Sequence, residues 1–408
     1  MNTGDTSWVL ASSALVMLMT PGLAFFYGGM VRRKNVLGVL MQCFTILAII
    51  SIQWVLFGYS LAFGPGKGFW GGFQWAGLCG VGLEPFKDYS ATIPHQAFMI
   101  FQAMFAIITP ALILGAFAER MKFSGFVVFM VLWATFVYDP VAHWVWGVGG
   151  WLRDLGALDF AGGTVVHINS GIAALATCLL IGRRKGYDKK PIPPHNLPHV
   201  MLGTALLWFG WFGFNAGSAL AANGLAVNAF VVTNTAAATA ALSWALIEWI
   251  YNGKPTAFGT ATGAVAGLVA ITPAAGFVSV MPAILIGIFV SVFCFLAVAI
   301  VKPLLGYDDS LDTFGVHCVG GVWGALATGL FASKLVNPDG AYGLFFGNPK
   351  QLLIQAAAVG ATLVYSFGAS IILYKVVDWV IGMRVTEKDE IMGLDLTQHN
   401  ENAYTILE

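Results

Sequence analysis

The amino-acid sequence predicts an all-α polytopic membrane protein with about eleven transmembrane helices. The chain of 408 residues is 58% hydrophobic and only 10% charged, whereas a soluble domain carries about 25% charged residues. Its mean hydropathy is +0.78, and apolar runs of about 20 residues, the length that crosses a bilayer, recur along the chain. The net charge of zero gives no reason to expect a nucleic-acid partner. Lipid is therefore the expected solvent for most of the chain.

The apolar runs place the individual spans. The first run follows the polar segment MNTGDTS, which has no basic residue. A cleaved signal peptide begins with a basic region, so we expect this run to remain as a span. The predicted spans lie near residues 8–30, 36–63, 95–117, 124–146, 160–182, 198–217, 226–250, 257–275, 279–303, 313–333 and 352–383. Glycine and proline interrupt the eighth run, and the last is long enough to tilt or to extend beyond the bilayer.

Lysine and arginine predict the orientation of the chain. Fifteen of the 20 fall in loops that follow odd-numbered spans or at the end of the last span, and five fall on the opposite side. Cytoplasmic loops carry the excess of these residues in membrane proteins. We therefore expect the N-terminus outside and the C-terminus inside the cell.

The sequence also contains a weak internal repeat. Three motifs recur in the same order: ITPA at 108–111 and 271–274, V-H-x-x-x-G at 166–171 and 316–321, and more weakly FYGG at 26–29 with FNAG at 214–217. Each match lies five spans from its partner. Because five is odd, the two copies enter the membrane from opposite sides, which predicts an inverted 5+5 repeat with one extra long helix and a shared pathway between the halves.

This pattern predicts the domain boundaries. A transmembrane domain is expected over residues 1–383, with repeat halves at about 8–182 and 198–333 and the extra helix at about 352–383. Residues 384–408 are expected to form a cytoplasmic regulatory tail.

His167 and His317 lie deep within predicted spans, at equivalent positions of the repeat. An ionisable group in a span is costly and usually faces a cavity or the bundle interior. Two neutral imidazoles can share one N–H, and such a pair can move a proton near neutral pH. The alternative is a pair of hydrogen-bonded core side chains. No carboxylate or thiolate cluster accompanies them, so we expect neither a metal nor a cofactor.

Acidic and aromatic residues flank these spans. Asp159 precedes the fifth span and is expected to cap its helix, to supply negative potential at an outer vestibule, or to do both. We expect Asp312, before the tenth span, to be its structural counterpart in the second half. Trp211 and Phe214 lie at a matched motif, and aromatic faces can hold a small cation without a buried counter-charge.

At these residues the chain resembles the ammonium transporter family (Amt/Mep/Rh), specifically its microbial Amt branch. The matching segments are PGLAFFYGGMVRRKN (21–35), FAIITPALILGAFAER (105–120), ALDFAGGTVVHINSG (157–171), GWFGFNAGSA (210–219), DTFGVHCVGG (312–321) and GLDLTQHNENAY (393–404). They extend from the first span to the tail, and motifs this long and ordered are specific. The resemblance implies a homotrimer of eleven-helix protomers, each with a narrow apolar pore.

The resemblance further implies roles for individual residues. An outer recruitment site for NH4+ would comprise Gln102, Phe105, Trp146, Asp159 and Ser218. Trp151 lies close to Trp146 in the sequence and could take its place. Phe105 and Phe214 would form a stacked gate, and His167 and His317, supported by Trp211, would line the pore below it.

The function implied is an ammonium transporter or channel in a prokaryotic cytoplasmic (inner) membrane, and not an enzyme. Ammonium or methylammonium would bind at the outer site and lose a proton near the gate. NH3 would then cross the pore, with or without the separated proton. The tail residues Gly393, Asp395, His399, Glu401 and Tyr404 resemble the family's regulatory C-terminus, which works with PII-type (GlnK) proteins; relatives usually have glycine at the place of Asn400.

Three alternatives differ in testable ways. An ammonium sensor with the same fold would conduct poorly, and we expect no kinase or cyclase domain after residue 408. A Rh-like channel would pass neutral gases, but the aromatic recruitment motif favours the Amt branch. A membrane enzyme using His167 and His317 would need a nucleophile or metal ligands beside them, which the sequence does not place there.

Overall fold

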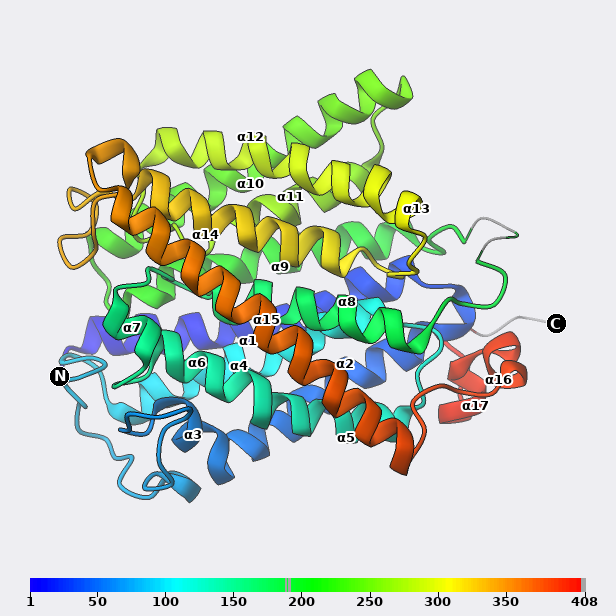
Figure 1. Cartoon of the computed structure of the whole chain (residues 1–408), viewed down its shortest axis with the longest axis horizontal. Coiled ribbons are helices and arrows are strands. Elements are labelled where there is room, and N and C mark those ends of the chain that lie inside the picture. Colours follow the sequence, from blue (N-terminus) through cyan, green and yellow to red (C-terminus); the bar gives the residue numbers. More distant parts are fainter. Residues whose placement is uncertain (188, 190–191, 405–408) are drawn as a thin grey trace.

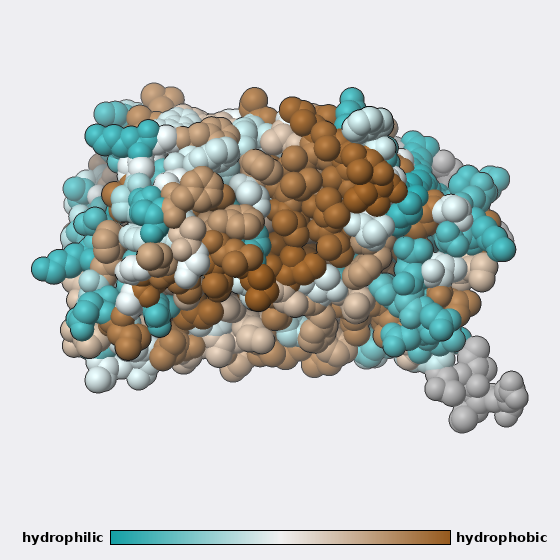
Figure 2. Space-filling view, turned by 90° about the horizontal axis from the view of Figure 1, so that it is seen from below, coloured by the Kyte–Doolittle hydropathy of each residue, from teal (hydrophilic) through white to brown (hydrophobic). Residues whose placement is uncertain are grey.

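The computed structural model describes residues 1–187, 189 and 192–404, and the described chain is almost entirely helical. The helices run roughly parallel to one another, with the N-terminus at one end of the bundle and the short helices α16 (Glu387–Met392) and α17 (Leu394–His399) at the other (Figure 1). Hydrophobic residues cover the middle of the visible face, and hydrophilic residues gather at both ends (Figure 2). This distribution is typical of a protein that crosses a bilayer.

Ten helical segments of the described chain are long and apolar enough to cross a membrane. Five segments are built on one helix each: α1 (Thr3–Met30), α4 (His95–Ile113, extended to Ala116), α9 (Leu197–Ala216), α10 (Gly224–Asn252) and α15 (Pro349–Val380). Two segments begin with a π-helical turn: Gly163–Ile181, which contains α8 (Asn169–Ile181), and Phe314–Phe331, which contains α14 (Val319–Phe331). Three segments combine several helices: Arg33–Phe63 contains α2 (Val36–Gln53) and α3 (Tyr59–Phe63), Phe123–Leu155 contains α5 (Phe123–Trp133), α6 (Asp139–Trp146) and α7 (Trp151–Leu155), and Val280–Leu305 contains α12 (Val280–Leu296) and α13 (Lys302–Leu305). The expectation of about eleven spans in an all-α fold is confirmed by these ten and one shorter apolar helix.

That shorter helix is α11 (Ala257–Ile271), which occupies the place of the interrupted eighth run. Its 15 residues span about 22 Å at 1.5 Å per residue, less than the hydrocarbon thickness. The chain then leaves the helix at Thr272 and Pro273. Twelve of its residues are buried, and non-helical backbone at membrane depth is tolerated where protein encloses it. The predicted end at residue 275 therefore lies four residues beyond the helix.

The two halves meet along α1 and α9, which pack closely over much of their length. Glycine permits this approach: a Cβ at Gly213 would lie 2.6 Å from the Cβ of Leu15, and one at Gly29 would lie 2.6 Å from the Asn196 carbonyl oxygen. The long helix α15 crosses the bundle diagonally and packs on α5, α8 and α14 (Figure 1). Lys190, one of the fifteen basic residues counted for the orientation, and residues 405–408 of the predicted tail lie outside the described residues.

Candidate functional site

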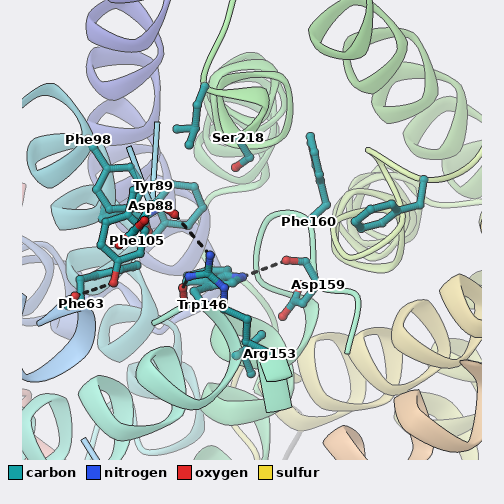
Figure 3. A pocket seen from close by; sticks show the side chains of 14 residues that line it. Phe63, Asp88, Tyr89, Phe98, Phe105, Trp146, Arg153, Asp159, Phe160 and Ser218 are labelled. Carbon is teal, nitrogen blue, oxygen red and sulfur yellow. Dashed lines mark hydrogen bonds between the residues drawn. The ribbon is translucent and has the colours of Figure 1, made fainter. Parts of the chain in front are cut away.

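A cavity of about 250 Å³ opens at the end of the bundle that carries the N-terminus. All five residues predicted for the recruitment site line it: Gln102, Phe105, Trp146, Asp159 and Ser218. Figure 3 labels the last four. They come from four segments of the chain, because Gln102 and Phe105 both lie on α4, and the packing of these segments brings them together. We call this space the outer cavity.

Trp146 is positioned by the loop that also carries Asp159. It is the last residue of α6, and its indole Nε1 donates to the Asp159 carbonyl at 2.8 Å. Its ring stands edge-on to that of Phe105, with centroids 6.0 Å apart. Trp151, the competing tryptophan, is 45% exposed and does not line the outer cavity.

Asp159 is buried, and its carboxylate accepts four backbone N–H bonds at the start of the fifth span. Oδ1 accepts from Gly162 and Gly163, and Oδ2 accepts from Thr164 and Val165, at 2.7 to 3.1 Å. Burial raises the pKa of Asp159, and the four N–H donors act in the opposite direction. The carboxylate thus caps the helix, and it also lies at the wall of the outer cavity.

Two phenylalanines close the floor of the outer cavity. The rings of Phe105 and Phe214 have centroids 4.3 Å apart and are tilted by 40°, and both side chains are buried. Phe105 lines the outer cavity, whereas Phe214 lines a smaller cavity beneath it. Ser218 is tied to the same helix, because its hydroxyl donates to the Phe214 carbonyl at 2.9 Å.

The smaller cavity holds both predicted pore histidines. Its volume is about 10 Å³, comparable with the space that one water molecule needs. Its wall is apolar except for the imidazoles and Trp211; the lining residues are Met19, Leu23, Phe26, Ile108, Leu112, Val166, His167, Leu207, Trp211, Phe214, Val265 and His317. A hydrated cation does not fit such a space, but a molecule of the size of ammonia does.

The two imidazoles face one another within this cavity. Nδ1 of His167 lies 3.3 Å from Nδ1 of His317, and the rings are nearly parallel, at an interplanar angle of 19°. Trp211 stacks on His167 with a centroid separation of 5.4 Å, and its Nε1 donates to the Thr272 hydroxyl at 2.9 Å. Trp211 therefore packs against one side of the histidine pair, and its hydrogen bond to Thr272 fixes it to the residue that follows α11.

Equivalent local structure places both histidines. His167 lies in the π-helical turn Gly163–Ile168, and His317 lies in the π-helical turn Phe314–Cys318. Each turn opens its span, and π-helical turns occur frequently at functional sites. The equivalence that the sequence motif predicted is thus present in the backbone.

One predicted correspondence is wrong. Asp159 lies eight residues before His167, and the residue eight positions before His317 is Asp309 rather than Asp312. Asp309 also performs the matching task, because its Oδ2 accepts from the Phe314 N–H at 2.7 Å. Asp312 instead pairs with Lys302, at 2.6 Å between Oδ1 and Nζ. It lines a cavity beneath the histidines together with Tyr27, Thr262 and His317.

Other residues of the outer cavity were not predicted from the sequence, and Tyr89, Phe98 and Arg153 are among them. Tyr89 and Phe98 stack there with centroids 4.6 Å apart, and the Arg153 side chain enters from α7 (Figure 3). Tyr89 lies in a long loop whose path no hydrophobic period indicates. Arg153 was counted only as one of five basic residues on the outer side.

The tail folds onto the end of the bundle opposite the outer cavity. Asp395 Oδ1 accepts from the Gly38 N–H at 2.8 Å, and the Leu394 N–H donates to Asn35 Oδ1 at 2.8 Å. Tyr404 shares a hydrogen bond with His195 Nε2 at 2.9 Å.

The remaining predicted tail residues belong to the same unit. Gly393 has φ +115°, His399 packs edge-on against Phe123, and the Glu401 N–H donates to the Asp395 carbonyl. Asn400 adopts φ +55°, in the left-handed region. Asparagine is among the residues that enter this region most readily after glycine, so Asn400 suits the tail conformation at a place where the resemblance implies glycine.

An outer aromatic cavity, a phenylalanine floor and a buried imidazole pair beneath it define a membrane transport protein for a small polar solute. The sequence model that describes the Ammonium Transporter Family matches residues 7–404 of this chain. The chain is 56% identical over 404 residues to the ammonium transporter of Bacillus subtilis, with 99% of each chain covered. This protein therefore belongs to the ammonium transporter family, and the expectations of a transporter rather than an enzyme and of a multi-pass membrane protein are confirmed.

Solved structures show the same fold. The structure of Candida albicans Mep2 superposes with a TM-score of 0.90 at 39% identity, covering 99% of this chain and 90% of the other. A structure described as a Sensor Amt Protein superposes with a TM-score of 0.89 at 30% identity, covering 97% and 98%.

Proposed function

We propose that this protein carries ammonium across the membrane, with NH4+ bound in the outer cavity and NH3 crossing the histidine cavity. The observation that carries the proposal is the order of the parts: aromatic outer cavity, Phe105–Phe214 floor, then the His167–His317 pair in a space for one small molecule. This order occurs in a chain that is 56% identical to a bacterial ammonium transporter.

The physical argument concerns the cost of moving a charge. Transferring an intact monovalent cation into an apolar space costs many kcal/mol. Ammonium can avoid that cost by losing a proton, whereas K+ cannot. The ring faces of Phe105 and Trp146, the Ser218 hydroxyl and the Gln102 amide would hold the cation before this step. The imidazole pair would then give the neutral molecule polar contacts, one nitrogen donating and the other accepting.

Orientation and assembly are parts of the same proposal. The excess of basic residues on one side favours an outer cavity that faces outside the cell and a tail in the cytoplasm. The family resemblance favours a homotrimer and tail control by a PII-type protein such as GlnK. The folded tail supports the second point, because it is attached through Asp395 and Leu394 yet leaves Glu387 62% exposed. Binding of a purified GlnK-type protein, lost on deletion of the tail, would test it.

A sensor function is the second candidate, because the chain also resembles the Sensor Amt Protein structure. The identity of 30% to that structure is far below the 56% to the Bacillus subtilis transporter. A sensor would bind ammonium in the outer cavity without passing it on. Transport therefore has to be measured directly.

Uptake of labelled methylammonium into proteoliposomes tests the proposal. We expect saturable uptake that ammonium inhibits and K+ does not. Trp146→Leu should raise the half-saturating concentration, while Trp151→Leu, which removes a tryptophan outside the cavity, should leave it unchanged. Uptake equal to that of empty liposomes, or equal effects of the two tryptophan variants, would count against the proposal.

A further inference from the structure

An arginine side chain stands inside the wall of the outer cavity. The Arg153 Nη1 donates to the Trp146 carbonyl at 2.8 Å, and Nη2 donates to the Asp88 carbonyl at 3.3 Å. The guanidinium carbon lies 5.8 Å from the centre of the Tyr89 ring. Figure 3 shows this side chain extending from α7 toward the centre of the labelled residues, close to Trp146.

These contacts hold the guanidinium in one place. The ring beneath it is itself fixed, because Tyr89 stacks on Phe98 at an interplanar angle of 6° and its hydroxyl accepts from the Val148 N–H at 3.1 Å. A guanidinium is protonated at every physiological pH. A permanent positive charge is therefore a built component of the cavity that we assign to ammonium.

The charge is not cancelled where it stands. Within the described residues its guanidinium donates two hydrogen bonds, both to neutral carbonyls, and Arg153 forms no ion pair there. The nearest wall carboxylates are those of Asp88 and Asp159, and the latter is occupied by four backbone N–H bonds. An arriving monovalent cation thus meets attraction from rings and carboxylates and repulsion from Arg153.

We propose that Arg153 sets the affinity of the outer cavity by opposing cation entry with a fixed charge. The inference rests on the proposed function of this cavity and adds a residue that determines the ammonium concentration at which the cavity becomes occupied. Two unit charges several ångströms apart in a wet cavity change occupancy by about three- to tenfold. The repulsion is exposed to solvent and is consequently screened by salt, with a Debye length of about 30 Å at 0.01 M and 8 Å at 0.15 M.

The test compares Arg153→Gln, which removes the charge but keeps a donor for the carbonyls, with Arg153→Lys, which keeps the charge. Ammonium-evoked current and ammonium-dependent tryptophan fluorescence are both measured, at low and at high sodium chloride. We expect Arg153→Gln to lower the half-saturating concentration about three- to tenfold at low salt, with the maximal current unchanged within about twofold. Arg153→Lys should match the parent, and the difference should shrink at high salt.

A purely structural role predicts another result. If Arg153 only supports the loop, Arg153→Gln lowers the maximal current or raises the half-saturating concentration, and salt does not alter the ratio of the two proteins. Either outcome overturns the proposal. Fluorescence distinguishes failure of the Arg153 proposal from failure of the proposed function. A parent that binds ammonium but carries no current refutes transport, and the ammonium-binding constants of the parent and of the Arg153 variants still decide the role of Arg153. A parent that does not bind ammonium refutes both.

Discussion

The Nδ1 atoms of His167 and His317 lie 3.3 Å apart in a space bounded by apolar side chains. At this distance one nitrogen donates and the other accepts, so a single proton is shared between two neutral rings. Nε2 of His167 has no partner among the described residues. Each ring can therefore offer its remaining nitrogen to a small molecule in the cavity, and a shift of the shared proton would exchange the two roles.

Removing either ring should impair transport by breaking this arrangement. We expect His167→Ala and His317→Ala each to lower the ammonium-evoked current by about ten- to a hundredfold, since the remaining imidazole loses its partner. Cys318→Ala is the matched control, because it alters the neighbouring buried residue in the same π-helical turn. A histidine variant with the parent's current and the parent's rejection of K+ would contradict the assigned role.

Asp159 provides a test of the outer wall. Asn at this position keeps one acceptor oxygen but turns an NH2 group toward two of the four N–H donors. We expect Asp159→Asn to destabilise the protein by about 2–4 kcal/mol and to reduce transport. Asp154→Asn removes an exposed carboxylate nearby and should stay within about 0.5 kcal/mol of the parent. Thermal unfolding in detergent distinguishes the two variants; equal midpoints would refute the capping role.

A buried charge network holds the end of the bundle that carries the tail. Arg184 bonds Glu119 at 2.7 Å and Asp308 at 2.7 Å, and its side chain is 7% exposed. Burial alone would raise the pKa of the Glu119 carboxyl, but the guanidinium groups of Arg184 and Arg32 reverse this and lower it. Arg184→Met would leave two carboxylates without this partner.

We therefore expect Arg184→Met to cost about 3–5 kcal/mol of unfolding free energy. Lys185→Met is the control, because Lys185 and Glu387 form an exposed pair at 2.9 Å that is worth at most about 1 kcal/mol. The comparison uses chemical unfolding in detergent micelles. Similar losses for the two variants would mean that the network adds nothing beyond surface charge.

Asp309 gives the stability a defined pH dependence. Burial raises its pKa to about 6, against the attraction of Lys302 and the N–H groups of Phe314 and Thr313, and Asp312 adds to the rise. The unfolded value is about 3.9. A raised pKa in the folded state contributes stability that is complete at low pH and is lost as the pH rises through the folded value.

Between about pH 5 and pH 7.5 the unfolding free energy of the parent should consequently fall by about 1.4 kcal/mol relative to that of Asp309→Asn. Unfolding curves of both proteins at the two pH values measure this difference, in which the contributions of all other groups cancel. A difference that stays constant, or changes in the opposite direction, would show that Asp309 does not titrate in this range.

Hydropathy and the repeated motifs were sufficient to predict the spans and the histidine pair. Both signals arise from lipid as solvent, which requires long apolar runs and makes an intramembrane histidine conspicuous. The loops gave no comparable signal. Asp312 was nevertheless the wrong choice among three neighbouring aspartates, because Asp309 precedes His317 by the same eight residues that separate Asp159 from His167, and its bond to the Phe314 N–H agrees with that spacing.

Other features depend on contacts between distant loops. Glu119, Arg184 and Asp308 lie on three loops that are polar in the sequence, and only the packing of the helices brings them into one buried network. Arg153 likewise counts as an ordinary outer basic residue until its hydrogen bonds to the Trp146 and Asp88 carbonyls place it in the cavity wall. Neither hydropathy nor motif spacing carries this information.

The most direct test of the account is an ammonium jump applied to proteoliposomes on a solid-supported membrane, with internal pH recorded in parallel. The account predicts a saturable current with ammonium, none with K+, and its loss in Asp159→Ala. A rise of internal pH without current would indicate passage of neutral NH3 alone. Ammonium binding with neither signal would contradict transport and leave the sensor as the function of this fold.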